Sequence, residues 1–111
     1  EDERHIREGL SKDELEIFDT LKKDKMTKDE EKRVKLAAKD LLHRLLEEHP
    51  RVLVQDWYKD SQSQLQVRGA IENVLDKDLP ESYNRIEFKK TCDKVYDLVY
   101  EYASKGVKWA A

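Results

Sequence analysis

Residues 27–50 read TKDEEKRVKLAAKDLLHRLLEEHP and decide the fold class of the chain. Thr27 and Glu30 have the spacing of a capping box, in which each side chain accepts a hydrogen bond from the backbone N–H of the other residue. Four apolar residues follow at i, i+4, i+7 and i+11: Val34, Ala38, Leu41 and Leu45. This spacing places them on one face of a helix. Because the residue before a proline avoids helical geometry, Pro50 ends the pattern, and we predict a helix over residues 28–48.

The same start signal occurs twice more. Ser11 and Glu14 predict a helix that runs to about residue 23. Asn84 and Glu87 repeat the signal in its N-x-x-E form, and they predict a last helix that stops at Gly106. The apolar face of this last helix spans only about 80° at 100° per residue. The face consists of Phe88, Cys92, Val95, Val99 and Tyr102, and we expect the first four of these residues to be buried.

A fourth helix is predicted over residues 61–79, where Pro80 ends the segment. Its apolar face consists of Val67, Ala70, Ile71 and Val74, with Leu75 as a further candidate. Gly69 weakens this helix by about 1 kcal/mol relative to Ala, and we interpret it as the mark of a close helix contact. Residues 51–60 leave two alternatives open, a short helical turn or an extended packed segment.

Length and composition fit one small domain. With 111 residues, the chain can bury roughly two-thirds of its unfolded surface. Charged residues make up 42% and hydrophobic residues 38%, but the hydrophobic residues recur with a helical period, which argues against disorder. We predict an all-α, compact domain of about four main helices with short connections over residues 11–111, after a linker or tail at residues 1–10. The chain begins at Glu1 without a methionine, which indicates a fragment of a longer protein.

No pattern in the chain predicts catalysis, a cofactor or a metal. A phosphate-binding loop of the form G-x-x-x-x-G-K-[ST] does not occur. Glu87 and Lys89 form the E-x-K of many metal-dependent nucleases, but residues i and i+2 of a helix face different directions. His43 and Glu47 lie at i and i+4 and supply only two ligands, too few for a metal site. We therefore expect no enzymatic activity from this chain alone.

The cysteine content, the lengths of the apolar runs and the net charge limit the cellular compartment and the class of partner that we expect. Cys92 is the only cysteine, which fits a reducing cytoplasm and a small core residue. No apolar run approaches about 18 residues, so we expect no membrane contact. The net charge of −3 argues against a nucleic-acid footprint over the whole domain, whereas a local basic patch remains compatible with it.

Basic residues of the last predicted helix form two groups. Arg85 and Lys89 lie with Tyr96 and Tyr100 within about 60° at 100° per residue, a combination that suits phosphate contacts and base stacking. A second strip lies on another side and consists of Lys90, Lys94 and Lys105. The alternative interpretation is a solvated face, because acidic residues intervene: Asp93, Asp97 and Glu101.

A second candidate surface combines residue types that anchor protein interfaces. It consists of Trp57, Tyr58 and Arg68. The indole of Trp57 leaves two alternatives open, an interface anchor or a core residue. From the residues alone, the prediction is therefore a helical interaction domain.

Residues 57–106 read WYKDSQSQLQVRGAIENVLDKDLPESYNRIEFKKTCDKVYDLVYEYASKG. This stretch resembles the extreme C-terminal region of the R subunit of type I restriction enzymes, and the IC subfamily looks closest. The resemblance is carried by Trp57 with Tyr58, by Arg68, by the DLPESY run at residues 78–83 and by the lysine-rich start of the last helix. The AAKDLLHRLLEE run and the HPRVLVQDW that follows also match, so the resemblance covers nearly the whole chain from Ser11.

The resemblance implies a role within a larger enzyme. The R subunit of that family couples ATP hydrolysis to DNA translocation and cuts DNA at distant sites. It uses an N-terminal nuclease domain and two RecA-like motor domains, and it joins modification and specificity subunits. None of those catalytic motifs is in this chain, so ATP and Mg²⁺ would belong to the parent subunit. What the resemblance implies here is a non-catalytic C-terminal domain for complex assembly and for contact with double-stranded DNA.

Two sets of site residues follow from the patterns and the resemblance together. For DNA contact along a basic edge we predict Arg85, Lys89, Lys90 and Lys94. For the protein interface we predict Trp57, Tyr58, Arg68 and Tyr83. The alternative function is a purely structural helical domain that stabilises the motor subunit without touching DNA.

Overall fold

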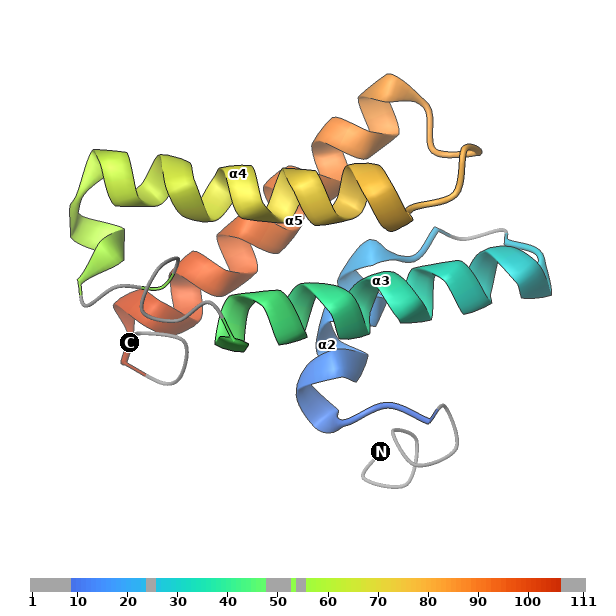
Figure 1. The fold of residues 1–111 in the computed structure, drawn as a ribbon, viewed down its shortest axis with the longest axis horizontal. Helices are drawn as coiled ribbons and strands as arrows, with labels where there is room; N and C mark the ends of the chain where they lie inside the picture. The colour runs from blue at the N-terminus through green and yellow to red at the C-terminus, as the bar shows by residue number, and fades with distance from the viewer. Residues whose placement is uncertain (1–8, 24–25, 48–52, 54–55, 107–111) are drawn as a thin grey trace.

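The computed structural model describes residues 9–23, 26–47, 53 and 56–106 (Figure 1). Within these ranges the chain is helical and contains no strand. Its elements are α2 (Lys12–Leu21), α3 (Lys28–Glu47), the single 3₁₀ turn η1 (Trp57–Lys59), α4 (Ser61–Asp78) and α5 (Arg85–Ser104). The predicted all-α, compact fold of four main helices is confirmed. Of the two alternatives left open for residues 51–60, the structure shows the short helical turn, η1. Most of the predicted tail, residues 1–8, and the end of the chain, residues 107–111, lie outside the described residues.

Local capping sets where the helices begin. Each of the three predicted capping boxes forms in both directions, with N···O distances of 2.8 to 3.1 Å. The start of α4 depends on a cap that was not predicted: the Asp60 carboxylate accepts from the backbone N–H of Ser63 at 2.9 Å and from its hydroxyl at 2.8 Å. Such caps satisfy backbone N–H groups that have no partner inside the helix.

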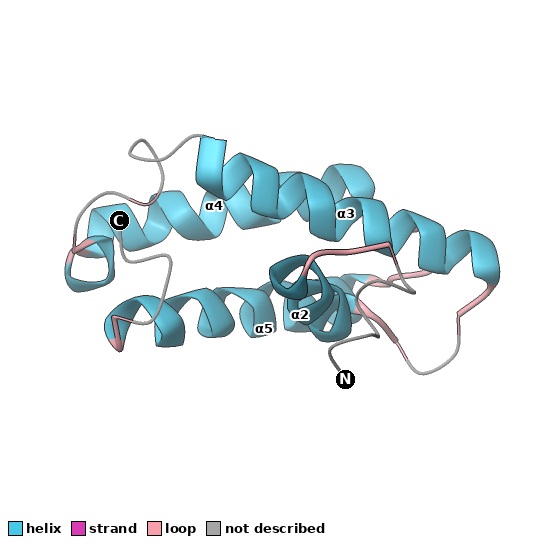
Figure 2. Cartoon of the chain, turned by 90° about the horizontal axis from the view of Figure 1, so that it is seen from below, coloured by secondary structure: helices cyan, strands magenta, loops and turns pink. Residues whose placement is uncertain are grey.

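The four α-helices form two layers (Figures 1 and 2). α3 and α4 lie side by side in one layer, and α2 and α5 lie side by side in the other. Each helix packs against two others in the cyclic order α2, α3, α4, α5, and η1 packs against α4 and α5. α2 and α5 are antiparallel, because Lys23 after α2 contacts Glu87 at the start of α5, while the Tyr102 hydroxyl near the end of α5 donates to the Glu16 carboxylate.

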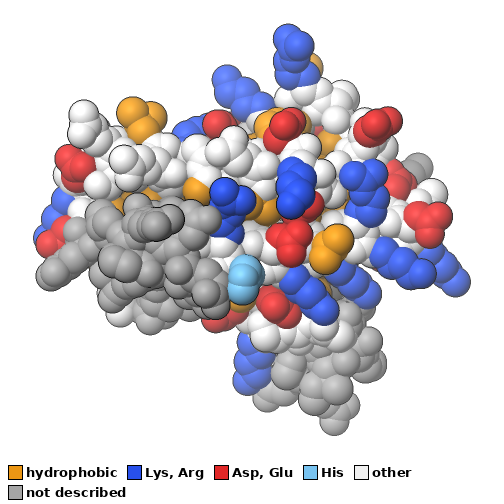
Figure 3. Space-filling view, viewed as in Figure 1, with side chains coloured by type: hydrophobic (Ala, Val, Ile, Leu, Met, Phe, Trp, Pro, Cys, Tyr) orange, Lys and Arg blue, Asp and Glu red, His pale blue; other side chains and the backbone are white. Residues whose placement is uncertain are grey.

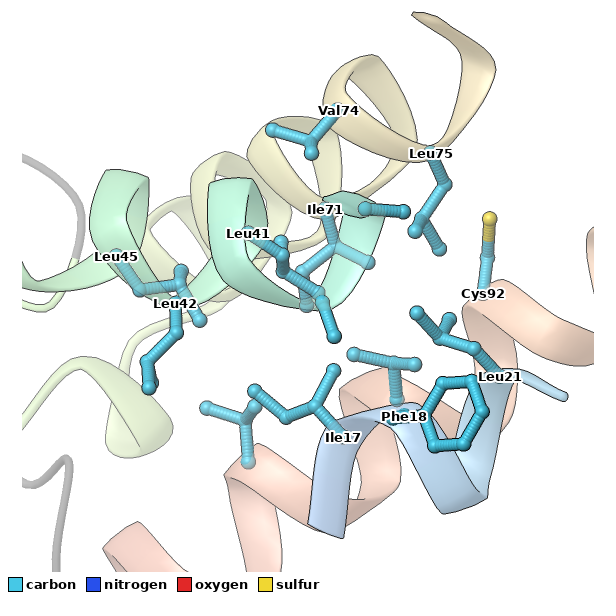
Figure 4. Close-up of a cluster of buried hydrophobic side chains, with 14 of the residues drawn as sticks. Ile17, Phe18, Leu21, Leu41, Leu42, Leu45, Ile71, Val74, Leu75 and Cys92 are labelled. Atoms are coloured by element: carbon cyan, nitrogen blue, oxygen red, sulfur yellow. The ribbon is translucent and has the colours of Figure 1, made fainter. Parts of the chain in front are cut away.

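The apolar faces of all four helices meet in one core (Figure 4). It includes Ile17, Phe18 and Leu21 of α2, Leu41, Leu42 and Leu45 of α3, Ile71, Val74 and Leu75 of α4, and Cys92, Val95 and Val99 of α5. Leu10, which we assigned to the tail, is also buried in this core.

Two expectations about packing are wrong. Phe88 is only half-buried, because it lies in the first turn of α5, where the bundle ends. Gly69 has no close neighbour, since a Cβ built on it would meet nothing within 4 Å. Gly69 therefore marks no close helix contact inside the described part of the chain.

Val95→Asp should destabilise the fold by about 3 kcal/mol or more, because it buries an unpaired charge in the centre of the core. Urea unfolding followed by circular dichroism measures the change. The matched control is Ile86→Asp, which adds the same charge to the same helix at a side chain that is 67% exposed. If both variants unfold at the wild-type urea concentration, the core-facing side of α5 has been assigned wrongly.

A carboxyl pair lies where α3 packs against α4. Asp78, the last residue of α4, is partly buried, and the side chain of Asp40 in α3 lies near it. Burial and the neighbouring Asp40 carboxyl raise the pKa of Asp78, and the nearby charges of Lys77 and Arg33 offset this only in part. The Oδ2 atom of Asp78 is buried without a hydrogen-bond partner among the described residues. This carboxyl is therefore held more easily in its protonated form in the folded state than in the unfolded chain.

Asp78→Asn should raise the melting temperature at pH 7 and leave it nearly unchanged at about pH 3. A carboxyl whose pKa is raised by folding contributes stability below the ordinary value of about 3.9, and it loses that contribution as the pH rises through the folded-state pKa. Asp76→Asn, an exposed change in the same last turn of α4, controls for the helix dipole. A gain for Asp78→Asn that equals the Asp76→Asn gain at both pH values would contradict the carboxyl pair as its cause.

Candidate nucleic-acid interface

The four basic residues predicted for DNA contact are all exposed on α5, but they divide between two flanks of the helix. Arg85 and Lys89 point to one side and Lys90 and Lys94 to the other, and the two pairs are centred about 140° apart at 100° per residue. The four residues predicted for one DNA-facing edge therefore lie on two sides of α5.

Lys90 and Lys94 line an open groove between α2 and α5. The hollow has a volume of about 560 Å³, and Lys22 and Lys23, which directly follow α2, line its other wall. We call these four residues with their hollow the lysine groove. The C-terminal end of α2 was not predicted to take part, because sequence periodicity does not show which helices are neighbours.

The four lysines of the lysine groove differ in how far their charges are neutralised. The ammonium of Lys22 lies 3.4 Å from the Asp19 carboxylate, and that of Lys23 lies 3.4 Å from Glu87. No ion pair within 4 Å joins Lys90 or Lys94 to any residue that the structure describes. Lys90 and Lys94 are therefore the two cations of the groove that an anionic ligand meets without first breaking an ion pair.

The segment before α5 fixes the lysine groove in place. The Tyr83 hydroxyl donates to the carbonyl oxygen of Leu21 at 2.6 Å and so satisfies a carbonyl at the C-terminal end of α2. Lys23 donates to the Ser82 carbonyl at 3.0 Å, and its ammonium lies 4.7 Å from the centre of the Tyr83 ring. The Ser82 hydroxyl donates to the Glu30 carboxylate at the start of α3. The DLPESY run is thus a structural connection between three helices.

Tyr83, which we predicted for the protein interface, is buried in the structure. Burial, together with the negative charges of Glu87 and Glu30, raises the pKa of its phenol to about 12. The phenol therefore stays protonated at neutral pH and keeps its hydrogen bond to Leu21. The sequence could have suggested this role only through the short connection between Pro80 and the cap at Asn84.

An aromatic cluster occupies the other flank of α5. Trp57 lies 6.0 to 6.1 Å, centre to centre, from the rings of Tyr58, Tyr96 and Tyr100, in near-perpendicular arrangements that favour aromatic pairs. Trp57 is fully buried, so the structure decides for the core alternative and against an exposed anchor. Tyr58 is half-buried at the edge of this cluster.

Arg68 of α4 contacts both an acidic and an aromatic side chain of α5. Its guanidinium pairs with Asp93, lies 3.5 Å from Glu72, and stacks 5.6 Å from the centre of the Tyr96 ring. A partner would have to compete with these contacts, so Arg68 is a weaker interface anchor than its residue type suggests.

The side chains that were considered as catalytic candidates have structural roles in this fold. Glu87 of the E-x-K accepts from the Asn84 backbone N–H at 3.1 Å, and this bond lowers its carboxyl pKa, with a further contribution from Lys23. Burial raises the pKa of the Cys92 thiol to about 11, so it stays protonated at neutral pH. In the described ranges, no three metal-ligating side chains come together, and no helix is both long and apolar enough to cross a bilayer.

Comparison with protein-family models, with curated proteins and with solved structures finds no match to this chain.

Tyr83→Phe should destabilise the fold by about 1 kcal/mol, since the Leu21 carbonyl loses its donor while the ring still fills the same space. Urea unfolding measures the loss. Tyr100→Phe is the matched control, because the Tyr100 ring is 37% exposed and its hydroxyl forms no hydrogen bond with another described residue. Equal stabilities of the wild type and Tyr83→Phe would show that this bond does not hold α2 to the start of α5.

Proposed function

We propose that the chain is a non-catalytic assembly and DNA-contact domain of the motor subunit of a type I restriction enzyme. In this proposal, it contacts the phosphate backbone of double-stranded DNA through Lys90 and Lys94. The observation that carries the proposal is that these two exposed lysines, which form no ion pair with a described residue, line a groove whose other wall adds Lys22 and Lys23.

The chemistry of the lysine groove suits phosphate rather than base recognition. Lysine ammonium groups on flexible stems act as point charges without the planar fork that reads a base edge. Contacts to phosphate carry no sequence information directly, so they are compatible with movement along any DNA. A chain of net charge −3 can still bind DNA in this way, because a local patch matters more than the total charge.

The resemblance suggests the larger enzyme in which this DNA contact would act. A motor subunit that translocates DNA benefits from contacts that do not depend on sequence. The modification and specificity subunits are the proposed protein partners, and ATP and Mg²⁺ act in other domains of the parent subunit. A cytoplasmic location follows from the same proposal.

A purely structural domain is the second candidate, and specific observations favour it. Lys22, Lys23 and Arg68 are engaged within the chain. On the face formed by α3 and α4, basic and acidic side chains are interspersed, so this face has no large region of one sign (Figure 3). The two candidates therefore differ in one measurable property, the charge-dependent affinity of the α2–α5 side for DNA.

Lys90→Gln with Lys94→Gln should weaken binding of the chain to a duplex of random sequence. Binding is measured by fluorescence anisotropy, beginning at about 50 mM salt, where phosphate contacts are strong. The slope of log K against log salt should become shallower by about two if each lysine meets one phosphate. Both lysines project away from the core, so circular dichroism should show an unchanged fold.

Arg85→Gln with Lys89→Gln is the matched control, because it removes the same charge from the opposite flank of the same helix. The proposal predicts a smaller loss for this control. Equal losses would show that only net charge matters. Unchanged affinity and salt slope for Lys90→Gln with Lys94→Gln would favour the purely structural domain.

A further inference from the structure

One carboxylate lies among the cations of the lysine groove. The residues that line the hollow include four lysines and a single acidic residue, Glu87. Its carboxylate lies 3.4 Å from the ammonium of Lys23 on the other wall. The bond from the Asn84 backbone N–H, and to a smaller extent Lys23, lower the pKa of this carboxyl, so it is ionised at neutral pH. An anion that approaches Lys23 therefore has to compete with Glu87.

We propose that Lys23 is a third phosphate contact of the lysine groove and that Glu87 competes with DNA for it. This inference rests on the proposed function and deepens it, because it names the next cation that a bound strand reaches and the carboxylate that limits the affinity. A bound phosphate takes the place of Glu87 beside Lys23, while the bond of Glu87 to the Asn84 backbone N–H stays intact.

The order of side chains along α5 leads a strand to this ion pair. Lys94, Lys90 and Glu87 lie within about 60° of one another at 100° per residue, so they share one side of the helix. Lys94 and Lys90 are separated by about 6 Å along the axis, and Glu87 follows about 4.5 Å beyond Lys90. A strand that follows the groove past Lys94 and Lys90 therefore reaches Glu87 and Lys23 next.

The Lys23–Glu87 pair is weak enough to exchange. Its separation of 3.4 Å is longer than the roughly 2.7–2.9 Å of a strong charge-assisted hydrogen bond, and the Glu87 side chain is 40% exposed. Such exposed ion pairs contribute little stability. Glu30, at the start of α3, also attracts Lys23, but the two form no ion pair within 4 Å.

The remaining contacts of Lys23 hold its ammonium beside the groove without neutralising it. The ammonium donates to the Ser82 carbonyl at 3.0 Å and lies 4.7 Å from the centre of the Tyr83 ring, and both partners are uncharged. Because an ammonium has three donors, Lys23 can keep the Ser82 bond and still donate to a phosphate.

Glu87→Gln tests the inference, because glutamine can keep the capping box while the charge beside Lys23 is lost. Duplex affinity, measured by the same anisotropy titration, should rise several-fold, and the salt slope should steepen by about one. Glu14→Gln is the matched control, since it makes the same change at the same position of the α2 capping box, and Glu14 does not line the groove. Its effect should be clearly smaller.

Lys23→Gln decides whether Glu87 acts through Lys23. In this background, Glu87→Gln should raise the affinity no more than Glu14→Gln does. A gain as large as in the wild-type background would show that Glu87 repels the strand directly and would overturn the contact at Lys23. A second measurement keeps Lys23 in place: the NMR signal of its side-chain ammonium should shift when duplex is added to the wild type, and an unchanged signal contradicts the contact.

The outcomes separate the inference from the proposed function. If Glu87→Gln gains no more than Glu14→Gln, while Lys90→Gln with Lys94→Gln still weakens binding, the third contact is wrong and the proposed function stands. If the Lys90 and Lys94 changes have no effect in either the wild type or the Glu87→Gln background, both ideas fail. Absence of DNA binding by the wild type and by Glu87→Gln also overturns both.

Discussion

The hydrogen bond from the Tyr83 hydroxyl to the Leu21 carbonyl joins parts of the chain that are 62 residues apart. It holds the end of α2 against the start of α5, and the Lys23–Glu87 ion pair reinforces the same junction. Because α2 contacts α3 and α5 contacts α4, this junction also closes the cycle of four helices. The lysine groove lies between α2 and α5, so a buried phenol that does not line the groove helps to hold the proposed interface in shape.

The elements that could be predicted from the sequence are those set by local chemistry. The capping boxes at Ser11, Thr27 and Asn84 each fix a helix start through bonds over three residues, and all three form as expected. The burial of Trp57 and Tyr83 was beyond such reasoning, because an amphipathic aromatic side chain suits a core and an interface equally well. Only the neighbouring helices decide between the two, and periodicity does not identify neighbours.

The candidate site shows the same limit. Helical geometry already places Lys90 and Lys94 together on α5, but the pairing of α2 with α5 brings Lys22 and Lys23 to them. The chain has 22 basic and 25 acidic residues, so the sequence alone does not show which cations lie together at one groove. That placement is a property of the tertiary structure.

Cys92 gives the molecule a built-in reporter of its own opening. It is the only cysteine, its side chain is 1% exposed on the face of α5 that packs into the core, and burial raises its thiol pKa to about 11. The thiolate is the reactive form of cysteine, so a thiol-specific reagent must wait until α5 separates from the core. The rate of labelling therefore measures how often the folded chain opens transiently under native conditions.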